Sequence, residues 1–375
     1  MNNQIKQEVK KPPIISIGFI GWLRENLFST WYNAVFTFLG IYIIYVAIPP
    51  FFQWAILDAV WSGDDRTVCE WYDENKVKYR AGACWLYIKV WFNFFTYGFY
   101  PDELQWRINL AFIILAVATA LLFIPNLKNK HFVGIFLFAV YPIIAFFLLS
   151  GNETLGFEHV GTHKWGGLFL TFLLGSIGIV FALPLGIVLA LGRRSKLPVV
   201  SILSVMFIEF WRGIPLITVL FFAAVMFPLF VPQGIEIDNL LRCIVGLTVF
   251  GGAYMAEVVR GGLQALPKGQ YEAAQAVGLG YWRMTALVIM PQALRIVIPG
   301  IVNTFIGLFK DTTLVFIISL MDLLLTVFTS MSNPDWMGFP FEGYVFTALI
   351  YFSICFSLSR YSLRVEKKLM VAHQK

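Results

Sequence analysis

This 375-residue sequence carries little charge. Asp, Glu, Lys and Arg together make up only 13 % of the chain, about half of the ~25 % that is usual in soluble globular proteins. Apolar residues make up 58 % and aromatic residues 17 %. A soluble particle of this size could not cover its surface with so few charged groups. The composition therefore excludes a soluble enzyme, a disordered chain and a nucleic-acid-binding protein, and it predicts a polytopic membrane protein.

The sequence also lacks recognisable nucleotide-binding, catalytic and metal-binding motifs. It has no G-x-x-x-x-G-K-[ST] phosphate-binding loop, so any ATP that drives this protein must be hydrolysed by another polypeptide. No Ser/His/Asp or Cys/His arrangement can be argued from its 4 histidines and 4 cysteines. Glu158, His159 and His163 have a metal-like spacing but lie in a glycine-containing loop without a further convincing ligand. We therefore predict no catalytic site, no metal site and no cofactor bound by this chain.

Long apolar runs are abundant. A hydrocarbon core ~30 Å thick is spanned by about 20 apolar helical residues. Uncharged runs of that length occur four times in the first half of the chain, over 31–57, 108–127, 131–152 and 165–192. In the second half, where charged residues interrupt the runs, we place helices at 199–232, 239–263, 292–310 and 342–363. The sequence predicts an all-α fold with about eight transmembrane helices.

The positions of Lys and Arg near the helix ends predict the orientation. These residues are Lys6, Lys10 and Lys11, Lys128 and Lys130, Arg193, Arg194 and Lys196, Lys268 and Arg283, and Arg364, Lys367 and Lys368. All of them face the cytoplasm if both termini lie inside. The first apolar run is too long for a signal peptide, so the N-terminus is expected to stay uncleaved. The long loop 58–107 then lies outside, because long loops translocate largely regardless of charge.

The four cysteines fall into two classes. Cys243 and Cys355 lie in predicted helices and are expected to be small apolar packing residues. Cys69 and Cys84 share the outer loop, which would face an oxidising periplasm in a Gram-negative host. The sequence is compatible with a disulfide between them and with two free thiols.

The segment 267–291 reads PKGQYEAAQAVGLGYWRMTALVIMP. Its first part has the composition of a helix, and Gly278 and Gly280 are typical helix-stop residues. Small side chains on an exposed short helix would let a partner's groove approach its backbone closely. The alternative is an amphipathic connector that lies on the membrane surface.

The spacing of residues within this segment favours the interpretation that it binds a partner protein. Glu272-Ala273-Ala274, then Gly278, then Val288-x-Met290-Pro291 resembles the EAA signature of ABC importer permeases, with Val and Met in place of Ile and Leu. The surrounding segments FIEFWRGIPL, GGAYMAEVVRGGLQALPKGQYEAA and FKDTTLVFIISLMDLL resemble the polar amino-acid (His/Glu/Gln/Arg/opine) subfamily. The resemblance covers about 165–364. The N-terminal part resembles the longer permease subunits of general L-amino-acid importers.

This resemblance implies an architecture and an assembly. Residues 1–164 would be an N-terminal extension with three transmembrane helices and a periplasmic loop. Residues 165–364 would form a type I importer permease core of five helices, and 365–375 a cytoplasmic tail. The expected partners are a second, shorter permease subunit in a heterodimer, a cytoplasmic ABC ATPase dimer that uses ATP and Mg²⁺, and a periplasmic amino-acid-binding protein. The location would be the inner membrane.

The resemblance also implies which residues couple ATP hydrolysis to transport. In such importers the EAA segment forms a coupling helix that fits a cleft in the ATPase, which would make Glu272, Ala273, Ala274 and Gly278 the coupling contacts. The pore would then open alternately to the two sides of the membrane. The competing hypothesis is a secondary transporter that uses an ion gradient and no ATP.

Charged residues at membrane depth form a second group. An ionisable side chain at the bilayer centre costs ~2.5–3.5 kcal/mol on insertion scales, so it usually faces a bundle interior or a wet path. A zwitterionic amino acid needs a cation for its carboxylate and an acceptor for its ammonium. The residues that could supply both are Glu209, Arg212, Lys310, Asp311, Thr312 and Thr313. We predict that they line the substrate pathway, with a self-satisfied structural pair as the alternative for Glu209 and Arg212.

Two further pairs of charged residues have simpler interpretations. Glu257 and Arg260 are three positions apart and so share one helical face. We predict that they form a structural ion pair that steadies the coupling region. Asp322 and Glu342 are expected near the outer surface, in contact with solvent.

Overall fold

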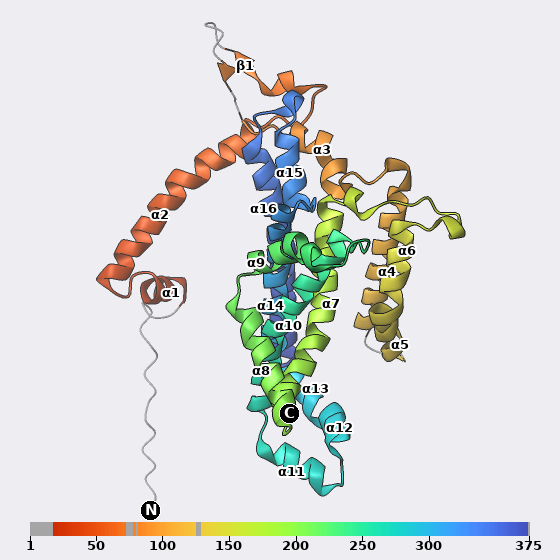
Figure 1. Ribbon diagram of the computed structural model, residues 1–375. Helices are drawn as coiled ribbons and strands as arrows, with labels where there is room; N and C mark the ends of the chain where they lie inside the picture. Colours follow the sequence, from red (N-terminus) through yellow and green to blue (C-terminus); the bar gives the residue numbers. More distant parts are fainter. Residues whose placement is uncertain (1–17, 73–77, 80–81, 125–128, 374–375) are drawn as a thin grey trace, which may run out of the picture. The chain divides into compact units, whose positions relative to one another are not determined.

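The computed structural model describes residues 18–72, 78–79, 82–124 and 129–373 (Figure 1). It divides into two compact units, 1–86 and 87–375. The predicted cytoplasmic residues Lys6, Lys10, Lys11 and Lys128 lie outside the described residues.

The first unit is built on one long helix. Its elements are α1 (Gly18–Asn26), α2 (Trp31–Phe52), a π-helical turn (Gln53–Leu57), a 3-10 turn (Arg66–Cys69) and the antiparallel strands β1 (Trp71–Tyr72) and β2 (Lys78–Tyr79). The side chain of Thr30 caps α2 by accepting a hydrogen bond from the Asn33 amide. No residue of α2 is buried in its unit. A helix that is apolar on every side matches a membrane span surrounded by lipid.

The loop that follows α2 is fastened to the end of this helix. Val60 N donates to the Ala83 carbonyl (2.8 Å), and Trp85 Nε1 donates to the Ala55 carbonyl (2.7 Å). Gly82 passes so close to the chain that a Cβ there would lie 2.2 Å from the Asp58 carbonyl oxygen. Only glycine fits at this crossing, because any side chain would displace the backbone.

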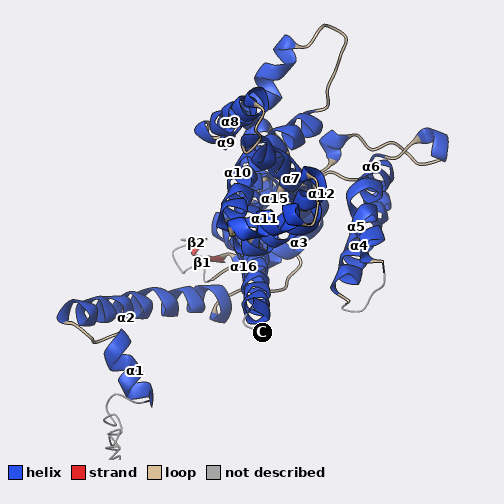
Figure 2. Ribbon diagram, turned by 90° about the horizontal axis from the view of Figure 1, so that it is seen from below, coloured by secondary structure: helices blue, strands red, loops and turns tan. Residues whose placement is uncertain are grey.

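The second unit begins with a helical hairpin. Its first elements are α3 (Trp85–Tyr97), a 3-10 turn (Asp102–Leu104), α4 (Gln105–Phe123), α5 (Lys130–Ile135), a π-helical turn (Phe136–Val140) and α6 (Tyr141–Ser150). Helix α4 runs beside the continuous α5–α6 rod in both views (Figures 1 and 2). Tyr141 donates from its hydroxyl to the Ala111 carbonyl (3.1 Å), and Tyr100 donates to the Leu149 carbonyl (2.8 Å). We call α4, α5 and α6 the α4–α6 hairpin.

The rest of the second unit is a bundle around two long helices. Its elements are α7 (Gly167–Arg193), α8 (Pro198–Gly213), α9 (Leu216–Phe221), α10 (Asn239–Ala265), α11 (Lys268–Ala276), α12 (Tyr281–Met284), α13 (Met290–Ile296), α14 (Ile298–Asp311), α15 (Leu323–Met331) and α16 (Pro340–His373). Short π and 3-10 turns extend α9 to Phe230, connect α12 to α13 and extend α14 to Ile318. Glycines let α7 and α10 approach closely, since a Cβ at Gly186 would lie 2.7 Å from Met255 Cβ.

The prediction of an all-α fold with about eight spans is confirmed. Among the described residues, seven helices are long and apolar enough to cross a membrane, and one bent pair of helices brings the number to eight. The described residues also contain two short strands that were not expected. The predicted boundary at residue 164 does not coincide with the division into compact units, because the α4–α6 hairpin belongs to the same unit as the bundle.

Two predicted helices are broken in the structure. The expected helix 199–232 bends by 101° between Gly213 and Leu216. Pro215 has no amide hydrogen and forces the preceding residue out of the helical region, and Ile214 accordingly has φ −105° and ψ 135°. The expected helix 292–310 is divided at Val297, two residues before Pro299.

The expectation that Asp322 and Glu342 are solvated is wrong. Both side chains are fully buried. The chain before α15 returns into the bundle, where Gly167 N donates to the Met321 carbonyl (2.6 Å) and Leu323 N donates to Thr171 Oγ1 (3.0 Å). Asp322 Oδ1 caps α15 by accepting from Leu325 N (3.0 Å), while Oδ2 is buried and has no hydrogen-bond partner among the residues that the structure describes.

The burial of Asp322 predicts a pH-dependent stability. Asp322 lies between two candidate spans, and burial raises its pKa from 3.8 to about 7. A folded-state pKa above the unfolded value means that this contribution to stability is fully present below about pH 4 and is lost as the pH rises to about 7. Asp322→Asn cannot ionise, so we expect it to be several degrees more heat-stable than the parent at pH 8, with a difference that shrinks steadily toward pH 4. Thermal unfolding of the purified protein tests this, and an equal pH dependence in both proteins would contradict it.

Candidate coupling and transport site

Helix α11 follows α10 directly and is stopped by a glycine. Pro267 precedes its first residue, and Gly278 follows its last turn with φ +77°. Gly278 N donates to the Gln275 carbonyl (2.9 Å), and Leu279 N donates to the Ala274 carbonyl (3.1 Å). These two bonds are the Schellman motif, which needs a left-handed residue at this position. The glycine stop predicted from the sequence is therefore present, and its physical reason is the positive φ of Gly278.

The predicted coupling residues do not all face the same way. Glu272, Ala273 and Gly278 are exposed, and a Cβ at Gly278 would meet nothing within 4 Å. Ala274 is only 4 % exposed and packs in a core cluster with residues of α10, α12 and α13. The structure thus leaves three of the four residues open to a partner and uses the fourth to hold α11 against the bundle.

Polar contacts fix α11 to the helix ends around it. Arg194, just after α7, donates to the hydroxyl of Tyr271 (3.0 Å) and to the carbonyl of Leu263 (2.9 Å). The same guanidinium stacks over the Tyr271 ring at 5.5 Å. Gln292 Nε2 donates to Gln270 Oε1 (3.0 Å). These contacts connect α11 to the ends of α7, α10 and α13.

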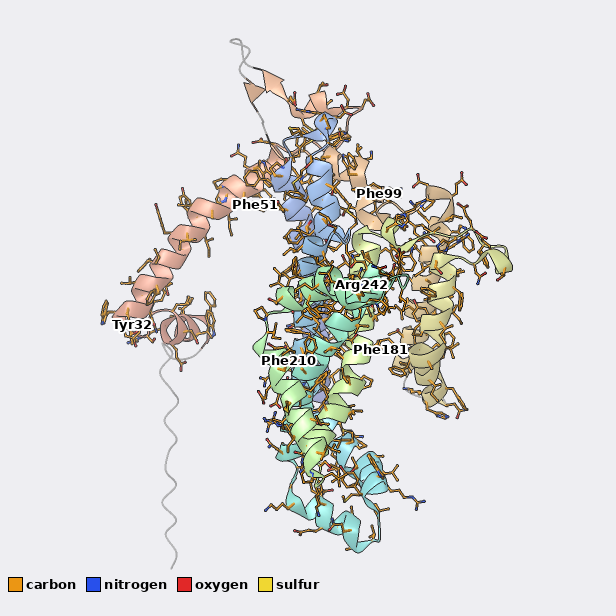
Figure 3. The ribbon with its side chains drawn as sticks, viewed as in Figure 1. Tyr32, Phe51, Phe99, Phe181, Phe210 and Arg242 are labelled. Carbon is orange, nitrogen blue, oxygen red and sulfur yellow. A yellow bond between two sulfur atoms is a disulfide. The ribbon has the colours of Figure 1, made fainter. Side chains whose placement is uncertain are left out.

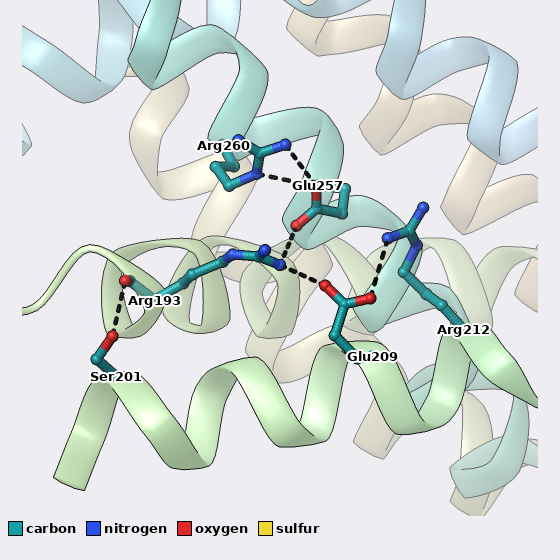
Figure 4. Close-up of polar contacts among 6 residues, drawn as sticks. All are labelled: Arg193, Ser201, Glu209, Arg212, Glu257 and Arg260. Atoms are coloured by element: carbon teal, nitrogen blue, oxygen red, sulfur yellow. Dashed lines mark hydrogen bonds and ion pairs between the residues drawn. The ribbon is translucent and has the colours of Figure 1, made fainter. Parts of the chain in front are cut away.

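Five charged side chains from α7, α8 and α10 meet in one group, which we call the ion cluster (Figure 4). Arg193 NH1 donates to Glu257 Oε1 (2.7 Å) and to Glu209 Oε1 (2.9 Å). Arg260 binds Glu257 Oε2 through Nε (2.9 Å) and NH2 (2.7 Å). Arg212 NH1 lies 3.9 Å from Glu209 Oε2. The cluster ties together three helices that the sequence analysis treated separately.

Arg193 joins the two predicted pairs, Glu209–Arg212 and Glu257–Arg260, although the sequence analysis gave it no role in either pair. Sequence analysis placed Arg193 only in a basic turn. It is the last residue of α7, its carbonyl accepts from Ser201 Oγ (3.0 Å), and its side chain runs along α8 (Figure 4). The sequence feature that could have indicated this role is an arginine directly at the end of an otherwise uncharged helix. That signal does not say which carboxylates the side chain reaches.

The contacts within the ion cluster differ in strength. The Glu257 side chain is 17 % exposed and makes three short contacts, whereas Glu209 is 53 % exposed and makes one. Arg212 is the most weakly tied cation, and its guanidinium lies 5.5 Å from the centroid of the Tyr254 ring. A partly exposed cation beside an aromatic face is able to bind a carboxylate.

The other predicted pathway residues lie at the end of α14. Thr312 is buried and donates its hydroxyl to the Phe309 carbonyl (2.7 Å), and Thr313 donates to the Lys310 carbonyl (2.8 Å). Lys310 is exposed and Asp311 is half-buried. Within the part of the chain that the structure describes, no ion pair joins Lys310 or Asp311 to the ion cluster. The ion pairs of the described residues therefore do not link Lys310 or Asp311 with Glu209 and Arg212.

The two cysteines of the outer loop form a disulfide in the structure. The Cα atoms of Cys69 and Cys84 are 5.7 Å apart, and both residues are buried. Cys243 and Cys355 are free, the first buried and the second partly buried.

Breaking this disulfide is expected to loosen the loop around it. Cys84→Ser should lower the local stability of the loop by about 3 kcal/mol, the chain-entropy value for closing a loop of roughly 15 residues. Limited proteolysis should then cut within 58–84 much faster than in the parent, while Cys355→Ser serves as the unaffected control. Peptide mapping in which both loop cysteines are alkylated without reductant would contradict the disulfide.

The fold and the site together describe a membrane protein of many helices with a short, exposed helix fixed to the ends of the bundle. The profile of the family "Binding-protein-dependent transport system inner membrane component" matches residues 182–371. The chain belongs to this family.

Similar proteins extend the match over nearly the whole chain. It is 52 % identical over 350 residues to the inner membrane amino-acid ABC transporter permease protein YhdY of Escherichia coli (strain K12), with 92 % of each chain covered. It is 39 % identical to the glutamate/glutamine/aspartate/asparagine transport system permease protein BztC of Rhodobacter capsulatus, with 96 % of each covered. The crystal structure of an amino acid ABC transporter with histidines is 28 % identical, with 54 % of this chain and 92 % of that chain covered and a TM-score of 0.48.

Proposed function

We propose that this chain is a permease subunit that carries polar L-amino acids across the inner membrane, driven by a separate ATPase. The observation that carries the proposal is α11, a short exposed helix with the EAA-like pattern, fixed to the ends of the bundle. The family match supports the class. The names of the two full-length relatives support amino acids as the cargo. Nothing in these comparisons supports an ion-gradient-driven secondary transporter.

The exposed face of α11 would be the docking surface for the ATPase. Glu272, Ala273 and Gly278 would enter its cleft, and Ala274 would act from within by holding α11 on the bundle. When the ATPase dimer closes on ATP and Mg²⁺, α11 would move as a rigid body. The contacts of Arg194 and Tyr271 would pass this movement to α7 and α10.

The assembly would contain three kinds of partner. A second, shorter permease subunit would complete the pathway as a heterodimer, two ATPase subunits would dock on the cytoplasmic side, and a periplasmic amino-acid-binding protein would deliver the substrate. Both termini would be cytoplasmic. Residues 165–364 would form the moving core, 1–164 the extension and 365–375 the cytoplasmic tail.

The substrate would meet opposite charges in the pathway. Arg212 would bind the carboxylate, because it is the least firmly tied cation of the ion cluster. Glu209, which is half exposed, would accept from the ammonium group. Lys310, Asp311 and Thr313 would contribute at another level of the path, and buried Thr312 would position them.

Reconstitution tests the proposed function. The chain is placed in proteoliposomes with the second permease and the ATPase, and labelled glutamate, glutamine, aspartate and asparagine are supplied with the binding protein. We expect uptake that requires ATP and survives an ionophore. Uptake that persists without ATP and collapses with the ionophore would overturn the proposal in favour of a secondary transporter.

A further inference from the structure

An apolar cavity of about 930 Å³ lies between the α4–α6 hairpin and the bundle. Its walls come from four candidate spans, those containing α4, α6, α7 and α10. The hairpin touches α7 through two sets of aromatic contacts. Phe112 meets Phe169 at 6.1 Å, and Phe138 meets Phe181 at 5.6 Å. Phe181 points from α7 toward the hairpin (Figure 3).

The length and lining of the cavity suit a hydrocarbon chain. Its wall on α7 extends from Phe169 to Phe181, roughly 18 Å at ~1.5 Å per residue. That is more than half of a hydrocarbon core ~30 Å thick. Leu115, Leu173 and Ile177 line the middle. Protein interiors are close-packed, so a gap of this size would deprive these side chains of contacts unless something apolar filled it.

One end of the cavity is polar and carries a cation. His159, Thr162, His163, Lys164 and Asp238 line it there. Asp238 is already engaged, because it caps α10 through Leu241 N (3.1 Å) and accepts from the Thr162 hydroxyl. Among the described residues no ion pair involves Lys164, which is exposed. The polar end therefore presents the exposed ammonium group of Lys164 and two imidazoles, which can donate to a phosphate, next to an Asp238 carboxylate whose two oxygens each already accept a hydrogen bond.

We propose that this cavity binds a phospholipid with an anionic headgroup. One or both acyl chains lie between α4, α6 and α7, and the phosphate lies at Lys164 and His163. In a bilayer the lipid is the apolar material that is always available to fill a gap between helices. The bound lipid connects the N-terminal extension to the permease core, and it does so independently of what the permease carries.

The decisive variants change the body and the rim of the cavity separately. Ile177→Trp fills the middle of the cavity, and Val117→Trp is its matched control, because Val117 lies on α4, is 55 % exposed and does not line the cavity. Lys164→Glu reverses the charge at the rim. Lys89→Glu is its control, on an exposed lysine of α3 outside the lining.

Native mass spectrometry of the full chain, purified in detergent and titrated with phosphatidylglycerol, gives the readout. We expect about one lipid retained per chain in the parent and in both controls, at least fivefold less in Ile177→Trp, and at least fivefold weaker phosphatidylglycerol binding with phosphatidylcholine binding unchanged in Lys164→Glu. Equal retention in Ile177→Trp and its control would overturn the proposal.

Photocrosslinking of the parent protein covers the case in which a variant does not fold. Phosphatidylglycerol with a diazirine in its acyl chain should label the peptides that contain Leu173 and Ile177 in preference to α2. Labelling confined to outward-facing helices would overturn the proposal. A second crosslinking experiment places benzoylphenylalanine at position 177 in the complete transporter. Capture of the second permease subunit and of no lipid would also overturn the proposal.

Discussion

Ala273→Arg is expected to abolish ATP-driven uptake, with a loss of at least a hundredfold, while the chain remains folded. Ala273 is exposed on α11, and substitutions at such positions usually change stability by less than about 0.5 kcal/mol. The arginine would instead keep the ATPase cleft away from the α11 backbone. The measurement is uptake in proteoliposomes together with co-purification of the ATPase on the tagged permease.

Two comparisons separate docking from folding in this experiment. Gln233→Arg places the same side chain in an exposed loop between α9 and α10 and should leave uptake unchanged. Ala274→Arg should fail differently, because this buried residue packs in the core and its replacement should lower thermal stability. If the ATPase stays bound to Ala273→Arg and cargo still moves, α11 is not the coupling helix.

Gly278 adds a third variant with a physical reason of its own. Its φ of +77° is unfavourable for residues with a side chain, at roughly 1–2 kcal/mol. Gly278→Ala is therefore expected to weaken the Schellman stop and shift α11, even though space is available for the methyl group. Gly278→Asn, which tolerates the left-handed region better, should retain more uptake than Gly278→Ala.

Glu257→Ala is expected to reduce uptake at least tenfold and to destabilise the protein by on the order of 2 kcal/mol. The substitution leaves Arg193 and Arg260 without their shared carboxylate on α10 and removes the ion pair between α7 and α10. Glu209→Ala should cost less than about 1 kcal/mol, because that side chain is half exposed and water screens its contacts. Chemical unfolding and uptake assays measure the two effects.

A double-mutant cycle tests whether the ion cluster acts as a unit. Arg193→Ala combined with Glu257→Ala should destabilise the protein by clearly less than the sum of the single changes, because either single change already removes the contact between these two side chains. Additive effects would show that Arg193 and Glu257 act independently. Full uptake in Glu257→Ala would show that the cluster does not transmit movement.

Local chemistry allowed several features to be predicted from the sequence. The scarcity of charge established the membrane class, and the length of the apolar runs gave the number of spans, because hydrocarbon excludes charged groups at any position. Gly278 marked a helix stop through the constraint on its own backbone. A 25-residue pattern was specific enough to indicate the family to which the chain belongs.

Other features could not be predicted, since they depend on which helices become neighbours. Helical periodicity cannot say that Ala274 faces the bundle while Ala273 faces out. A long arginine reaches carboxylates on two other helices, and Arg193 finds both Glu209 and Glu257 only after α7, α8 and α10 have packed. Asp322 was expected in solvent because it is charged, yet the return of the chain against α7 buries it.

Span number, helix stops and family thus follow from residue chemistry, which acts over a few residues along the chain. The orientation of α11, the ion cluster and the cavity beside the α4–α6 hairpin arise only from packing. The reason is that packing brings together side chains from segments far apart in sequence. The local sequence of one segment does not specify which other segment will cover it.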